Sequence, residues 1–129
     1  MLNLLTVSSD DKSFSALAAA FAKHDDVTLF QVLSGAAALK SITDKTYDLI
    51  IIDEILDDMA GLELAEKVIK INSMINCAAV STLAQDEFHE ASEGLGILAQ
   101  LPKNPGAAQA EAILSRLREI INLMKGDLS

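Results

Sequence analysis

The carboxylate of Asp53 is the side chain in this sequence that is best placed for chemistry. It directly follows the aliphatic run Leu49–Ile52, which predicts a buried strand, and a side chain at the end of such a strand reaches the surface of a domain. A carboxylate can act as a nucleophile towards phosphorus and form an acyl phosphate. Three more acids, Glu54, Asp57 and Asp58, follow it; we interpret them as solvated charge at the start of the next helix, with attraction of a cation as the alternative.

The elements that must position Asp53 are five short apolar runs that alternate with five helical patterns. The run at 49–52 is contiguous rather than alternating, which indicates a strand buried on both faces. Alternating strands and helices predict an α/β fold with a parallel sheet and right-handed crossovers. Five units in this length fit the flavodoxin-like (βα)5 doubly wound sheet, with strand order 2-1-3-4-5. The predicted strands are Leu2–Val7, Val27–Leu33, Asp48–Asp53, Asn76–Ser81 and Ile97–Leu101, and the predicted helices are Ser13–His24, Ser34–Ile42, Leu62–Ile71, Gln85–Glu93 and a last one from Asn104–Pro105 to about Lys125.

In such a sheet the functional groups lie at the carboxyl ends of the strands. This rule selects three loops, Ser8–Lys12, Asp53–Met59 and Ser81–Gln85.

Composition limits the classes of function. The chain has 129 residues, which fits one domain, and a net charge of −9. With ten basic against nineteen acidic residues, binding to nucleic acid or to an anionic membrane surface is not expected. A single cysteine, Cys77, excludes an internal disulfide and favours a reducing, cytoplasmic setting. We interpret Cys77 as a small core residue.

The third-strand loop resembles that of response-regulator receiver domains. In that family a strand ends in the phospho-accepting aspartate, a methionine follows six residues later and a glycine eight residues later. Asp53, Met59 and Gly61 have this spacing, and the five β/α units fall where the family has them. The resemblance therefore covers residues 1–129 as a single receiver-like domain.

The resemblance implies a set of site residues. Asp53 would accept the phosphoryl group, and the hydroxyl of Ser81 would contact a phosphoryl oxygen. For Ser81, a hydrogen bond to the local backbone is an equal alternative. Mg²⁺ would be held by Asp10, Asp53 and the backbone carbonyl of Ile55, although capping of the following helix is the alternative role for Asp10 and Asp11. The implied partner is a sensor histidine kinase or a phosphotransfer protein.

Several positions depart from the family pattern. Without a gap, the metal-binding acidic pair aligns with Ser8 and Ser9, whose hydroxyls would weaken Mg²⁺ binding. The lysine that precedes a proline at the end of the fifth strand is replaced by Leu101, and Lys103 lies two residues further on. Lys103 would reach the site only if the loop bends differently. The aromatic residue of the switch is replaced by Leu98.

These departures leave two functions open: a phosphorylated receiver, or a phosphorylation-independent pseudo-receiver that serves as an interaction or dimerisation scaffold. An enzyme on the same fold ranks lower, because no glycine-rich phosphate loop and no nucleophile triad is found. The last helix carries a broad apolar stripe, which favours a homodimer or a partner surface as strongly as simple core packing. That stripe comprises Ile113, Leu114, Leu117, Ile120, Ile121 and Met124, with Leu123 outside it.

Overall fold

The computed structural model describes the backbone of residues 1–126 and the side chains of residues 1–123. Five parallel strands form one sheet in the order β2-β1-β3-β4-β5, so the predicted flavodoxin-like α/β topology is confirmed. The strands are β1 (Leu2–Val7), β2 (Val27–Val32), β3 (Leu49–Ile52), β4 (Asn76–Val80) and β5 (Ile97–Leu101). The helices are α1 (Ser15–Phe21), α2 (Gly35–Asp44), α3 (Gly61–Ile71), α4 (Gln85–Ala91) and α5 (Ala107–Gly126).

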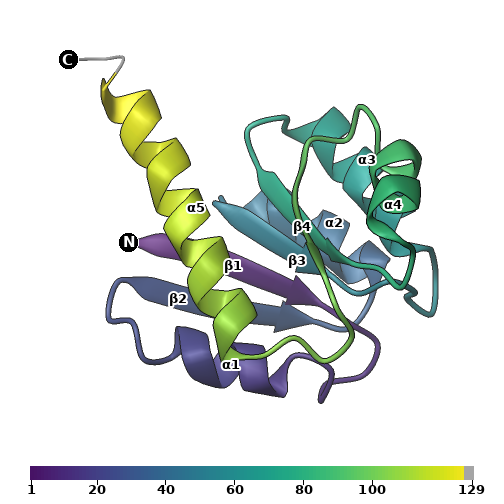
Figure 1. Cartoon of the computed structure of the whole chain (residues 1–129), viewed down its shortest axis with the longest axis horizontal. Coiled ribbons are helices and arrows are strands. Elements are labelled where there is room, and N and C mark those ends of the chain that lie inside the picture. The colour runs from purple at the N-terminus through teal and green to yellow at the C-terminus, as the bar shows by residue number, and fades with distance from the viewer. Residues whose placement is uncertain (127–129) are drawn as a thin grey trace.

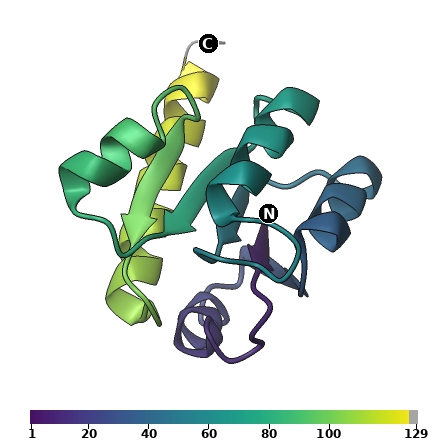
Figure 2. The same cartoon turned by 90° about the vertical axis from the view of Figure 1, so that its right-hand side faces the viewer.

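Helices cover both faces of the sheet (Figure 1). Successive side chains of a strand point to opposite faces. In β3, Leu49 and Ile51 pack in a core that contains residues of α1 and α5, whereas Ile50 and Ile52 pack in a second core with α2 and α3. In Figure 2, α2 and α3 lie together, while α4 lies apart from them near β5. The contiguous aliphatic run thus has the two-sided burial that its composition predicts.

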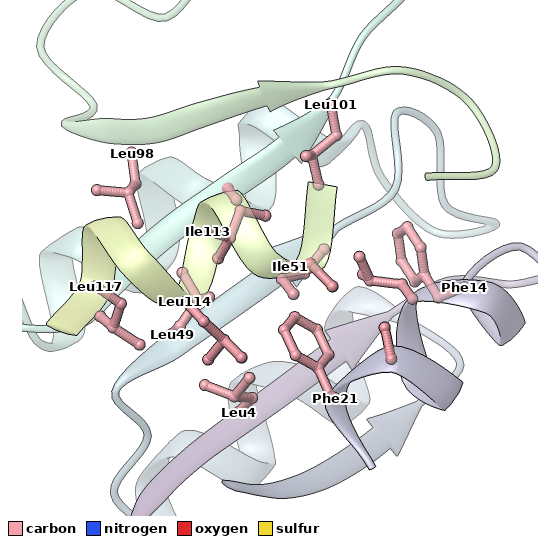
Figure 3. Packing of buried hydrophobic residues seen from close by; sticks show 14 of the residues in the cluster. Leu4, Phe14, Phe21, Leu49, Ile51, Leu98, Leu101, Ile113, Leu114 and Leu117 are labelled. Carbon is pink, nitrogen blue, oxygen red and sulfur yellow. The ribbon is translucent and has the colours of Figure 1, made fainter. Parts of the chain in front are cut away.

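The core on the α1–α5 side is shown in Figure 3. Phe14 and Phe21 supply its aromatic rings, and aliphatic residues of the central strands fill the rest. Leu98 and Leu101 of β5 both belong to this core and are less than one-tenth exposed. Neither side chain is therefore available at the surface of the sheet edge where Asp53 lies.

Cys77 lies in β4 and is buried, as predicted. Burial disfavours the charged thiolate and raises the pKa of Cys77 to about 12. The thiol is accordingly a packing group in the core rather than a nucleophile.

Two helices begin later than the sequence pattern predicts. α1 starts at Ser15 instead of Ser13, because the preceding residues form a turn in which the Ser13 N–H donates to the carbonyl of Asp10 at 3.2 Å. α5 starts at Ala107 instead of at Asn104–Pro105. Asn104 has a φ of 51° and cannot be an ordinary N-cap, and the side chain of Gln109 instead accepts the Gly106 N–H at 2.8 Å.

The apolar stripe of α5 faces the sheet. Ile113, Leu114 and Leu117 are buried in the core, and Ile120 and Ile121 pack against it. Leu123 is 70% exposed, and Met124 lies outside the described side chains. Core packing therefore accounts for most of the stripe, and a homodimer through α5 stays a prediction.

Two ion pairs at the surface hold α5 against the turn between α1 and β2. The pairs join His24 to Glu111 and Asp26 to Arg118, each at 2.8 Å. Among residues 1–126, no helix has the length and apolar character that crossing a membrane requires.

Candidate functional site

Asp53 lies at the carboxyl end of the central strand β3, next to the end of β1. Its backbone N–H donates to the carbonyl of Val7 at 2.9 Å, which fixes the residue relative to β1. Gly61, at the start of α3, lies very close to the backbone of Asp53. A Cβ atom at Gly61 would lie 2.2 Å from the carbonyl oxygen of Asp53, so only glycine fits there. The spacing of eight residues between Asp53 and Gly61 thus has a steric cause in this chain.

The carboxylate of Asp53 is held by two hydrogen bonds. Its Oδ1 accepts the backbone N–H of Glu54 at 2.8 Å, and its Oδ2 lies 2.7 Å from the hydroxyl of Ser8. Ser8 is 1% exposed, and its oxygen also lies 2.8 Å from the carbonyl of Asp10 and accepts the Asp10 N–H at 3.1 Å. The single hydroxyl proton goes to the carboxylate, because a charged acceptor forms the stronger hydrogen bond.

The other polar side chains of the loop after β1 form hydrogen bonds to backbone groups. Asp10 is exposed, and its Oδ1 accepts the N–H of Lys12 at 2.9 Å in the turn before α1. The hydroxyl of Ser9 accepts the N–H of Asp57 at 2.8 Å and donates to the carbonyl of Leu33 at 3.2 Å. Asp10 therefore holds the turn before α1 and does not cap the helix itself, whose N-cap position is Phe14 without a side-chain hydrogen bond. Its part in binding a metal ion stays a prediction.

A cavity of about 220 Å³ opens beside Asp53. It is lined by Ser13, Phe14, Asp53, Glu54, Ile55, Lys103 and Asn104. The loop after β5 thus brings Lys103 to the cavity that contains Asp53. The positive φ of Asn104 marks the bend that follows Lys103. Within the described part of the chain, Lys103 is in none of the four ion pairs.

Ser81 follows β4 and is buried. Its N–H donates to the carbonyl of Leu101 at 3.0 Å, and its hydroxyl oxygen accepts the N–H of Leu83 at 3.2 Å. The structure thus shows the hydrogen bond of Ser81 to the local backbone, and Ser81 is not among the residues that line the cavity. Its contact with a phosphoryl oxygen stays a prediction. Its own hydroxyl proton donates to none of the described residues.

The acids that follow Asp53 are not merely solvated charge at the start of α3. Glu54 reaches the end of β4, where its Oε2 accepts the N–H of Thr82 at 2.7 Å. Asp58 caps the start of α2, because its two oxygens accept the N–H groups of Gly35 and Ala36, each at 2.9 Å. The N–H groups of Ala36 and Gly35 hold the pKa of Asp58 below its ordinary value. The sequence gives no local signal for either contact, since the partners are more than twenty residues away.

The donor set around Asp53 is poorer in carboxylates than a divalent cation prefers. Among the described side chains, those of residues 1–123, there is no group of three or more acidic, histidine or cysteine residues that could hold a metal ion. The carboxylate of Asp10 is bonded to the backbone of its own turn, and a hydroxyl of Ser8 stands where an acid would be needed. Of the three predicted ligands, Asp53 and Ile55 line the cavity and Asp10 does not.

Comparison with known proteins agrees with this fold. A family model described as the response regulator receiver domain matches residues 5–117. No curated protein is significantly similar to the chain in sequence.

Several solved structures have the same fold. The signal receiver domain of an HD domain-containing protein from Pseudomonas fluorescens has a TM-score of 0.82 and 17% identity, over 97% of this chain and 92% of that chain. A two-component response regulator from Clostridium difficile has a TM-score of 0.81 and 18% identity, over 95% and 99% of the two chains. A CheY-like receiver domain protein from Methanospirillum hungatei has a TM-score of 0.79 and 22% identity, over 92% and 95%.

Proposed function

The chain belongs to the family of response regulator receiver domains, and we propose that it acts in phosphorelay signalling by accepting a phosphoryl group on Asp53. Receiver domains are signalling modules of two-component systems rather than enzymes, and they interact with histidine kinases or phosphotransfer proteins. The proposed donor is therefore a phosphorylated histidine on such a partner, and the proposed setting is the cytoplasm. The observation that carries the proposal is the shared cavity of Asp53 and Lys103.

The reaction is a transfer between two nucleophiles. An oxygen of the Asp53 carboxylate attacks phosphorus, a new O–P bond forms, and the P–N bond of the donor breaks with its electron pair going to the imidazole. The hydroxyl of Ser8 and the N–H of Glu54 fix the direction of the carboxylate. Each of the two carboxylate oxygens accepts one of these hydrogen bonds and keeps a lone pair for the attack on phosphorus.

Lys103 is the proposed cation of this site. The transferred group carries negative charge into a cavity that already contains Asp53 and Glu54, so a nearby ammonium group lowers the barrier. Leu101 has no such role, because its side chain belongs to the core. The loop after β5 therefore compensates for the missing lysine by presenting a residue two positions further along the chain.

Mg²⁺ has a smaller proposed part than in other members of the family. Receiver domains generally bind Mg²⁺ at an acidic pocket, whereas Ser8 and Ser9 replace the acids here. Asp53 and the carbonyl of Ile55 would be the remaining ligands, with Asp10 joining only if its turn opens. We propose a weakened site, so that phosphorylation depends more on Lys103 than on the metal ion.

The test is intact mass spectrometry after incubation with acetyl phosphate, with and without Mg²⁺. We expect one phosphoryl adduct, which Asp53→Asn abolishes and the matched control Asp10→Asn retains. Lys103→Ala should slow adduct formation by about tenfold or more, while Ser81→Ala should change its rate or its lifetime. No adduct in the wild-type protein under either condition would refute the proposal and support the alternative, a phosphorylation-independent interaction scaffold.

A further inference from the structure

Glu54 connects the ends of two neighbouring strands through its side chain. Its Oε2 accepts the backbone N–H of Thr82 at 2.7 Å, and the hydroxyl of Thr82 lies 3.0 Å from Oε2 and 3.2 Å from Oε1. Three contacts thus join one carboxylate to one residue that lies 28 positions away in the sequence. Charge-assisted hydrogen bonds of this length are strong for a surface loop.

The same residue also contacts Asp53. The backbone N–H of Glu54 donates to Asp53 Oδ1 at 2.8 Å, and both residues line the 220 Å³ cavity. Glu54 therefore links the carboxylate of Asp53 to the end of β4: its backbone N–H binds Asp53 and its side chain binds Thr82.

The segment that Glu54 holds is the loop 81–84 before α4. On its other side, the side-chain amide of Gln100 in β5 donates to the carbonyls of Leu83 at 2.8 Å and Ser81 at 3.3 Å. α4 begins at Gln85 and has no side-chain cap at its start. Among the described residues, two side chains from neighbouring elements thus fix this loop by hydrogen bonds. Glu54 binds Thr82, and Gln100 binds the carbonyls of Ser81 and Leu83.

We propose that Glu54 is a charge-sensitive latch, which holds the loop 81–84 while Asp53 carries its single negative charge and releases it when charge is added in the cavity. The proposal rests on the function proposed above. A phosphoryl group on Asp53 carries about 1.5 to 2 negative charges at neutral pH. It replaces the single charge of the carboxylate, so the cavity gains up to about one negative charge. Because like charges repel, the carboxylate of Glu54 then moves towards solvent, and the N–H of Thr82 loses its acceptor.

Opening of the latch would change the protein surface near the start of α4. Leu83 follows Thr82 directly and is 41% exposed, and α4 begins two residues later. Release of Thr82 frees one of the two sides on which this segment is held. Modification of Asp53 would in this way change the position of an exposed apolar residue and of the start of α4.

The first experiment tests the latch without phosphorylation, by NMR of the amide of Thr82. Glu54→Gln keeps the size of the side chain and removes its charge. We expect the amide of Thr82 to exchange with solvent about tenfold faster and its proton resonance to move upfield. The matched control is Glu63→Gln, because Glu63 is an exposed acid of α3 paired with Lys67. An unchanged Thr82 amide in Glu54→Gln would overturn the latch.

The second experiment tests the response to charge. Lys103→Glu replaces a positive by a negative charge at the exposed rim of the cavity, and it should loosen Thr82 in the same direction as Glu54→Gln. Combining the two substitutions should add little further effect, because the latch is already open. If Lys103→Glu leaves Thr82 unchanged in the otherwise intact protein, charge in the cavity does not control the latch and the inference is wrong.

The third experiment separates this inference from the proposed function. After treatment with acetyl phosphate, mass spectrometry reports the adduct and NMR reports Thr82 in the same sample. An adduct that shifts Thr82 and Leu83 in the wild-type protein, but shifts them much less in Glu54→Gln, supports both proposals. An adduct that shifts the two proteins equally overturns the latch alone. Absence of an adduct overturns the function alone, since the first two experiments need no phosphorylation.

Discussion

Replacement of Ser8 by alanine tests the contact that holds Asp53 most directly. Ser8 is 1% exposed, and its hydroxyl donates to Asp53 Oδ2 at 2.7 Å while accepting the N–H of Asp10 at 3.1 Å. A hydrogen bond to a charged group contributes about 1.5–3 kcal/mol, and a neutral one about 1 kcal/mol. Asp53 is only half-buried, so water replaces part of the lost interaction.

The free energy of unfolding should therefore fall by about 2 kcal/mol in Ser8→Ala. For a domain of this length, that loss lowers the melting temperature by roughly 6–10 °C. Chemical denaturation followed by far-ultraviolet circular dichroism measures the free energy, and thermal scans measure the melting temperature. The slope of the denaturation curve should not change, because the substitution leaves the buried area almost the same.

Ser9→Ala is the matched control. Ser9 is the next residue in the same loop, and its hydroxyl contacts only backbone groups of Asp57 and Leu33. We expect a loss of about 1 kcal/mol or less, because these partners are neutral and this loop is partly exposed. If Ser8→Ala is no less stable than Ser9→Ala, then Ser8 does not hold the carboxylate of Asp53 and the reasoning fails.

Two further substitutions test the loop after β3. Gly61→Ala places a methyl group 2.2 Å from the carbonyl oxygen of Asp53, so the backbone must move; we expect a loss of about 3 kcal/mol or more by chemical denaturation, and a smaller loss would show that this loop adapts freely. Asp58→Asn removes the charge that caps α2. Because the folded pKa of Asp58 is lowered, its contribution to stability is present above the unfolded value of 3.8 and is lost as the pH falls through the folded pKa. The wild-type and Asp58→Asn proteins should thus differ in stability at pH 7 and converge at low pH.

The fold was predictable because its signals are local. Each strand is a short aliphatic run, and the four-residue run of β3 is buried on both faces, as contiguous leucine and isoleucine residues indicate. The starts of α1 and α5 were less predictable. Serine at position 13 and the Asn104–Pro105 pair are both favourable cap residues, yet a turn and a positive φ placed the helix starts two or more residues later.

The sequence predicts the central residue of the site, Asp53, but not the contacts that its neighbours make with other loops. The spacing of Asp53 and Gly61 is readable in the sequence, and so is the replacement of the family's lysine by Leu101, which packs in the core. The contact of Glu54 with Thr82 depends on the packing of β3 beside β4, and no pattern in either segment encodes it. The approach of Lys103 to the cavity similarly depends on how the loop after β5 bends.

The replacement of the family's acidic pair by Ser8 and Ser9 lowers the negative charge around Asp53. A site with an acidic pair beside Asp53 gathers three carboxylates, and a divalent cation is then needed to balance them. Ser8 and Ser9 remove two of these charges, and Ser8 donates a proton to the one that remains. The cavity keeps Asp53 and Glu54 as its acids and Lys103 as its cation, so it carries a small net negative charge without a metal ion. Lys103 cannot neutralise both acids and an incoming phosphoryl group together. An added negative charge therefore repels the carboxylate of Glu54, the second acid of the cavity. The loss of the acidic pair and the charge response proposed for Glu54 thus have the same physical origin.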